Sequence, residues 1–192
     1  MTRRKIEFTN REGHTLTGAL EQPEAGPVRV MALFAHCFTC GKDVVAATRI
    51  ASALAEQGIA VFRFDFTGLG GSDGDFGNTN FSSNVEDLLD AAEFLTEHYQ
   101  APRLLIGHSL GGAAVIAVAQ RLNSVKAVVT IGAPATASHI NHLFIDHYDE
   151  IMTKETAQVH LAGRNFKIQR QLIEDLENYN SVEHIKTLGK AL

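Results

Sequence analysis

Apolar segments of strand length alternate with segments of helix length through the middle of this chain. The strand-length segments are residues 28–35, 59–66, 103–107 and 125–131, and the helix-length segments between them are residues 43–57, 83–95 and 109–122. Strands that are apolar on both faces are typical of parallel sheets covered by helices on both sides. The alternation therefore predicts an α/β fold with a mostly parallel, doubly wound sheet.

The regions outside this alternation predict further elements. Residues 5–9 and 15–21 read as two short strands joined by a turn, and residues 83–86 read as a capping box that begins a helix. Apolar residues at helical spacing predict a helix over residues 139–152, followed by a hairpin around residues 162–165. We expect one domain over residues 1–192, with a core in residues 1–136 and a lid-like insertion in residues 137–180.

Composition excludes several classes of protein. The chain has 192 residues and a net charge of −5, which argues against a general binder of nucleic acid or anionic membranes. The basic residues at the start precede no apolar run of signal-peptide length, and no run is long enough to span a membrane. We therefore expect a cytoplasmic protein. Its two cysteines are too few to hold together a small secreted fold.

Ser109 is the candidate nucleophile. Residues 107–112 match the pattern Gly-x-Ser-x-Gly and join an apolar strand to an apolar helix, where a tight turn exposes the serine above the sheet. A second match, at residues 70–74, lies in a polar loop, so its Ser72 is interpreted as a turn residue. The helix that follows Ser109 offers unpaired N–H groups, and the N–H of Leu110 is one candidate donor to an oxyanion.

These segments resemble the α/β-hydrolase superfamily. Residues 107–112 are similar to its nucleophile elbow, residues 35–38 to its oxyanion loop, and residues 65–74 to its loop after the fourth strand. The resemblance implies the strand order 1-2-4-3-5-6, which brings the residues after the third strand next to Ser109. It implies the N–H of Phe38 as the second oxyanion donor, with Cys37 as the alternative. Asp65 is expected to hold the Gly-rich loop.

Residues 36–43 and 65–76 resemble, more narrowly, bacterial proteins in which such a hydrolase is fused to an OsmC-like domain. That resemblance implies a fused OsmC-like domain as a partner in the full-length protein. No OsmC-like sequence is found within residues 1–192.

The acid and base of a catalytic triad are not evident in the sequence. In the superfamily they follow the seventh and eighth strands, and residues 188–192, where the chain stops, could only begin the seventh. We therefore expect a fragment whose acid and base lie beyond Leu192. An unpaired apolar edge at residues 126–131 then predicts self-association. The alternative is a base within the chain, one of His139, His142, His147, His160 and His184.

Other constellations support weaker interpretations. Cys37 and Cys40 form a Cys-x-x-Cys between a strand and a helix, which is typical of thiol redox modules. Polar residues at helical spacing could ligate a metal, but the solvated face of a helix explains them better, and no metal or cofactor is expected. These residues are His139, His142, Asp146 and Asp149.

The sequence therefore predicts a serine hydrolase that acts on a small-molecule acyl substrate, and a carboxylic ester is the expected class. The rival hypotheses are a thiol redox module and a non-catalytic α/β interaction domain. In the lid hypothesis, the apolar face of residues 139–152 covers an acyl pocket.

Overall fold

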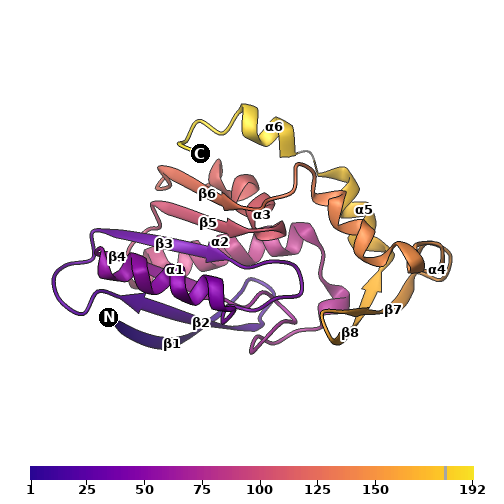
Figure 1. Cartoon of the computed structure of the whole chain (residues 1–192), viewed down its shortest axis with the longest axis horizontal. Coiled ribbons are helices and arrows are strands. Elements are labelled where there is room, and N and C mark those ends of the chain that lie inside the picture. Colours follow the sequence, from indigo (N-terminus) through magenta and orange to yellow (C-terminus); the bar gives the residue numbers. More distant parts are fainter. Residues whose placement is uncertain (180) are drawn as a thin grey trace.

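A six-stranded sheet forms the centre of the computed structural model, which describes residues 1–179 and 181–192 (Figure 1). The strands lie in the order β1-β2-β4-β3-β5-β6. The first two pair antiparallel and β2 pairs antiparallel with β4, whereas the remaining pairs are parallel. The fold class and strand order predicted from the sequence are confirmed. The strands are β1 (Thr2–Thr9), β2 (Thr15–Gln22), β3 (Val30–Ala35), β4 (Ile59–Phe64), β5 (Leu104–His108) and β6 (Ala127–Ile131).

Helices cover the two faces of this sheet (Figure 1). Helix α1 (Val45–Glu56) packs small side chains against β3, β4 and β5 on one face. Helices α2 (Phe81–His98) and α3 (Leu110–Ala119) cover the other face and contribute to the larger core. Every residue of α3 is buried, as expected of a helix that is apolar on all sides.

Helix α2 begins earlier than the sequence predicted. Asn80 is the N-cap: its side chain accepts from the N–H of Ser83, whose hydroxyl accepts in turn from the N–H of Asn80. The capping box therefore spans residues 80–83 rather than 83–86. Asn is as good an N-cap residue as Ser, and the earlier start buries Phe81.

A smaller lobe follows β6. Its hairpin, predicted around residues 162–165, packs against the short helix η1 (Phe76–Asn78), which precedes β6 in the chain. The helix predicted over residues 139–152 is instead a 3₁₀ segment followed by an α-helix, because Phe144 has non-helical backbone angles. The remaining elements of the lobe are η2 (Ala137–His147), α4 (Tyr148–Lys154), β7 (Thr156–Leu161), β8 (Arg164–Gln169) and α5 (Arg170–Asn178).

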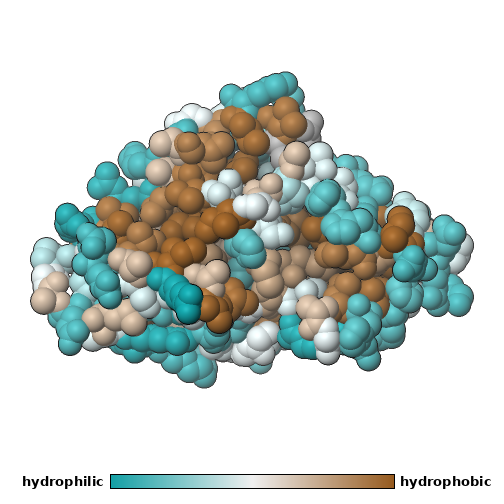
Figure 2. Space-filling view, in the orientation of Figure 1, coloured by the Kyte–Doolittle hydropathy of each residue, from teal (hydrophilic) through white to brown (hydrophobic). Residues whose placement is uncertain are grey.

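Strand β6 lies at the edge of the sheet. Helix α6 (Ser181–Lys186) leads the chain back to this edge, where the N–H of Val128 donates to the carbonyl of Ala191 at 2.8 Å. Ala191 and Ala127 form one isolated parallel bridge. Val129 and Ile131 stay 45% and 36% exposed, and Figure 2 shows apolar surface gathered over the β5–β6 side of the molecule.

None of the helices built from residues 1–179 and 181–192 combines the length and the apolar character that crossing a membrane requires.

Candidate active site

Ser109 stands at the junction of β5 and α3, where the backbone turns sharply. Its φ of 54° and ψ of −125° lie in a region that residues with a side chain rarely occupy. Its N–H donates to the carbonyl of Ile131 at 2.9 Å, and its own carbonyl accepts from the N–H of Gly112 at 2.8 Å. These bonds hold the serine in a strained conformation at the carboxyl end of β5.

The glycines on either side of Ser109 have no room for a side chain. A Cβ atom on Gly107 would lie 2.3 Å from the carbonyl oxygen of Gly111, and one on Gly111 would lie 2.4 Å from that of His36. Both distances are shorter than real Cβ contacts. The pattern in the sequence is therefore a steric requirement, because strand, turn and helix approach each other at backbone contact distance.

The two candidate oxyanion donors, the main-chain N–H groups of Phe38 and Leu110, follow two neighbouring strands of the sheet. Ala35, at the end of β3, is paired with Gly107 of β5, so the loop after β3 lies beside the turn at Ser109. Leu110 is the first residue of α3, where N–H groups have no partner within the helix. In the described part of the chain, the N–H groups of Phe38 and Leu110 donate to no protein acceptor. They are therefore available to a ligand.

His36 anchors the loop after β3. The ring is buried, and the N–H of Phe66 donates to Nε2 at 3.4 Å. Nδ1 lies 2.8 Å from the carbonyl oxygen of Cys37, which fits a neutral ring protonated at Nδ1. Burial lowers the pKa of His36 from its ordinary value, so the neutral ring is the stable form. Nothing in this geometry frees His36 to act as a general base.

Cys37 and Cys40 are joined by a disulfide within the same loop. The N–H of Cys40 also donates to the carbonyl of Cys37 at 3.0 Å. Between them, the buried Thr39 has a φ of 61°, which is rare for a β-branched residue. Arg164 on β8 donates to the carbonyl of Thr39. The segment that carries Phe38 is therefore held by covalent and polar contacts together.

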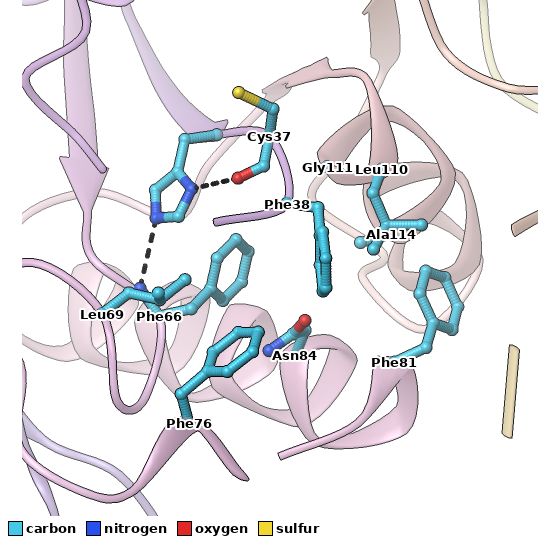
Figure 3. A pocket seen from close by; sticks show the side chains of 11 residues that line it. Cys37, Phe38, Phe66, Leu69, Phe76, Phe81, Asn84, Leu110, Gly111 and Ala114 are labelled. Atoms are coloured by element: carbon cyan, nitrogen blue, oxygen red, sulfur yellow. Dashed lines mark hydrogen bonds between the residues drawn. The ribbon is translucent and has the colours of Figure 1, made fainter. Parts of the chain in front are cut away.

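A narrow cavity, with room for about one water molecule, lies against Leu110 and the loop after β3. Figure 3 shows aromatic rings around it, with the ring of Phe38 directed in among its neighbours. The ring centroids of Phe38 and Phe76 are 5.6 Å apart. Asn84 adds an amide, which makes no hydrogen bond with any other described residue, so the cavity suits an apolar group with room for one polar contact. The other aromatic side chains in the lining are Phe66 and Phe81.

Ser72, in the second Gly-x-Ser-x-Gly match, is confirmed as a turn residue. Its hydroxyl donates to the carbonyl of Asp65 at 2.6 Å and accepts from the N–H of Thr17 at 2.9 Å. The carboxylate of Asp65 accepts from the N–H of Gly71 at 2.9 Å and from Nζ of Lys42 at 2.7 Å. The expectation that Asp65 holds the Gly-rich loop is confirmed as well.

The histidines that follow Ser109 make no hydrogen bond with it in the described residues. His160 faces Asn165 at 2.8 Å, and His184 stacks on Tyr179. His139 and His142 lie on the exposed side of η2, with ring centroids 4.9 Å apart. Among residues 1–179 and 181–192 there is no group of three or more His, Cys, Asp or Glu that could hold a metal ion. The metal hypothesis therefore has no geometric support.

The segment after β6 reaches the cavity wall from outside. Phe166 on β8 packs against Phe76 with ring centroids 4.9 Å apart. On α5, Asp175 accepts from the N–H of Ser82 at 2.7 Å. Three apolar side chains of η2 are buried, those of Ala137, Ile140 and Phe144, but Leu143 and Ile145 are 43% and 62% exposed. The lining comes from residues 36–38, 66–84 and 110–114, so a lid role for residues 137–180 stays a prediction.

Comparison with known proteins identifies the class. The family described as "Serine aminopeptidase, S33" matches residues 33–187, and the chain belongs to this family within the α/β-hydrolase superfamily. It is 44% identical to the esterase domain of a Rhodothermus marinus protein, over 99% of this chain and 74% of that one, with a TM-score of 0.73.

Two further relatives are more distant. Est1E from Butyrivibrio proteoclasticus, in a structure with ferulic acid bound, shares the fold at a TM-score of 0.76 with 18% identity, over 94% of this chain and 73% of that one. The uncharacterized protein YfhR of Escherichia coli O157:H7 is 26% identical over 114 residues, which are 59% of this chain. The match spans 40% of the length of YfhR.

Sequence reasoning missed the lining of the cavity. Phe76 and Phe81 lie in and after the Gly-rich loop, and Asn84 lies in the first turn of α2. The aromatic residues of the loop were the available signal, but their convergence depends on how the loop folds back over the sheet.

Proposed function

We propose that this protein is a serine esterase in which Ser109 attacks the carbonyl of a small acyl substrate. One observation supports the proposal: strained Ser109 follows β5, and the N–H groups of Leu110 and of Phe38, on the loop after the neighbouring β3, have no acceptor in the described chain. Strain at such a position is typical of functional sites. The similarity to the Rhodothermus marinus esterase domain supports the ester as the substrate class.

The proposed reaction proceeds through an acyl-enzyme. The hydroxyl of Ser109 loses its proton to a histidine and attacks the acyl carbonyl, which becomes a tetrahedral oxyanion. The N–H groups of Phe38 and Leu110 donate to that oxygen, and the dipole of α3 adds to the stabilisation. The leaving alcohol takes the proton from the histidine, and water then hydrolyses the acyl-enzyme. These steps need no cofactor.

The cavity beside Leu110 supports a small acyl group. Its phenylalanine lining favours an apolar chain, and its enclosed part has room for about one water molecule, which favours a short one. We expect p-nitrophenyl acetate or butyrate to be hydrolysed faster than the octanoate ester.

The histidine that serves as the base remains a prediction. One hypothesis places the acid and base beyond Leu192, and the other uses one of the five histidines that follow Ser109. Hydrolysis by the 192-residue chain that depends on Ser109 would count against the first hypothesis. A series of single His→Ala variants would then identify the base.

A fluorophosphonate probe tests the proposed function directly. We expect one covalent adduct on Ser109, located by peptide mass spectrometry, and none in the Ser109→Ala variant. Ser72→Ala is the matched control and should label like the native protein. If Ser109 is not labelled, alkylation of Cys37 or Cys40 after mild reduction would favour the thiol redox module. Absence of labelling by the probe, and by the alkylating reagent after reduction, would favour the non-catalytic domain.

We further propose that this chain self-associates through β6 and that it acts in the cytoplasm beside a fused OsmC-like domain. Ala191 covers the edge of β6 at residues 126–128, and the exposure of Val129 and Ile131 beyond it supports self-association, because unpaired apolar edges pair with other chains. Light scattering should show a dimer or larger species that Val129→Lys converts to a monomer. A monodisperse native monomer would contradict this.

A further inference from the structure

We propose that the Cys37–Cys40 disulfide is a redox-controlled modification site that sets the position of the Phe38 N–H and thereby the rate of hydrolysis at Ser109. The inference rests on the proposed function. Its basis is the placement of the bond, which closes the short loop that contains Phe38.

The loop closed by the disulfide holds one of its residues, Thr39, in a backbone conformation that this residue type disfavours. Thr39 has a φ of 61° and is buried, and a β-branched residue avoids this conformation when it is free to do so. The disulfide fixes both neighbours of the Phe38–Thr39 segment. Without it, Thr39 can relax by turning the peptide group that joins it to Phe38, and the preceding peptide group, which carries the N–H of Phe38, can shift in response.

The remaining contacts of the loop lie at the carbonyls of Cys37 and Thr39 and at the ring of Phe38. The carbonyl of Cys37 accepts from the N–H of Cys40 and faces Nδ1 of His36, and Arg164 holds the carbonyl of Thr39. The ring of Phe38 packs against Phe76. The carbonyl of Cys37 shares a peptide group with the N–H of Phe38, so its bond from the N–H of Cys40 orients that N–H, and the disulfide holds Cys40 in place to donate it.

The position of the bond permits chemistry with external thiols. Both cysteines are partly exposed, and Figure 3 shows the sulfur of Cys37 pointing away from the phenylalanine rings of the cavity. A reductant can therefore reach the bond from outside the cavity. A dithiol supplies two electrons and two protons: the protein S–S bond breaks, two S–H bonds form, and the two sulfurs of the dithiol join in a disulfide.

The disulfide-bonded form is the active one in this scheme. Complete loss of one oxyanion donor lowers the rate by about 10²–10³-fold. A relaxed loop still visits the productive conformation, so we expect reduction to lower kcat by at least about tenfold. KM should change little, because the donor acts on the oxyanion of the transition state.

The test compares one preparation before reduction, after dithiothreitol, and after reoxidation with oxidised glutathione. Hydrolysis of p-nitrophenyl acetate gives kcat and KM, and hydrogen exchange of the peptide over residues 36–41 reports the loop. We expect reduction to lower kcat and to speed exchange, and reoxidation to reverse both. The Cys37→Ser/Cys40→Ser variant should behave like the reduced protein with or without dithiothreitol.

A glycine at the strained position gives an independent measurement. Thr39→Gly removes the conformational conflict, so this variant should lose less kcat on reduction than the native protein does. Equal hydrolysis in both redox states, or loop exchange that reduction leaves unchanged, would overturn the redox inference and leave the proposed function standing. Absence of Ser109-dependent hydrolysis in both states would overturn the proposed function, and the redox inference with it.

Discussion

Two segments of this chain share the pattern Gly-x-Ser-x-Gly, and their serines have different surroundings. Ser109 has a strained backbone, and its hydroxyl makes no hydrogen bond with another described residue. The hydroxyl of Ser72 makes two hydrogen bonds, to the main chain of Asp65 and of Thr17. A serine whose hydroxyl is fully used within the protein stabilises a loop, whereas a serine held without a partner is available for chemistry.

The glycines of the two segments are required for different steric reasons. At Gly107 and Gly111 an added side chain would collide with the backbone of neighbouring elements. At Gly70 it would collide with the carboxylate of Asp65, and the φ of 56° favours glycine there. The first pair permits a strand to turn directly into a helix, and the second glycine permits a loop to wrap around a carboxylate. The pattern is the same, and the flanking elements decide its meaning.

The largest expected difference between the segments is catalytic. Ser109→Ala should lower the hydrolysis of p-nitrophenyl acetate by about 10³-fold or more, because no other group replaces the nucleophile. Ser72→Ala should stay within a few-fold of the native rate. Comparable losses in both variants would break the distinction between the two serines. Circular dichroism would show whether each variant remains folded.

The next effect concerns stability around Ser109. Gly107→Ala should lower the free energy of unfolding by about 3 kcal/mol, since its Cβ would lie 2.3 Å from the carbonyl oxygen of Gly111. Gly71→Ala, in the other segment, should have little effect because its Cβ would lie 3.5 Å from Thr17. Urea unfolding measures both. A tolerated alanine at Gly107 would mean that the turn is looser than described.

A smaller effect is expected at the turn serine. Ser72→Ala removes a donor to Asp65 and an acceptor for Thr17, and it should cost about 1–2 kcal/mol of unfolding free energy. Ser109→Ala should cost almost nothing, or should stabilise the fold, because the hydroxyl it removes has no partner in the described chain. The reverse ranking in urea unfolding would contradict the assignment of Ser72 to a structural role.

The smallest effect is a dependence on pH at His36, whose ring lies between the loop after β3 and Phe66 at the start of the Ser72 segment. Burial lowers the pKa of His36 below its ordinary 6.5, so the unfolded chain takes up the proton at a higher pH than the folded protein does. Stability from the neutral ring is full above about pH 6.5 and is lost as the pH falls towards the folded pKa. The loss is at most about 1.4 kcal/mol per pH unit.

The matched variant for this effect is His36→Gln. Urea unfolding at about pH 7.5 and about pH 5.5 should show its stability difference from the native protein shrinking at the lower pH. A difference that is the same at both pH values would mean that the buried ring of His36 is not held neutral.

Much of the fold was predictable because its signals are local. Apolar strands, the all-apolar segment after Ser109 and the glycines around it each satisfy a requirement of nearby backbone. The start of α2 was misplaced because Asn80 and Ser83 both resemble caps, and only the burial of Phe81 selects the first. The helix predicted over residues 139–152 breaks at Phe144, where packing within the smaller lobe outweighs helical spacing.

The sequence by itself determined the order of the elements and the turn that presents Ser109, since both follow from side-chain size and hydrophobic periodicity over a few residues. Only the tertiary structure decided that the loop after β3 lies beside that turn, that Cys37 and Cys40 are joined, and which phenylalanines line the cavity. Those features join residues from separate loops. Their positions depend on the pairing of β3 with β5 and on how the Gly-rich loop folds around Asp65, and neither leaves a local signature in the chain.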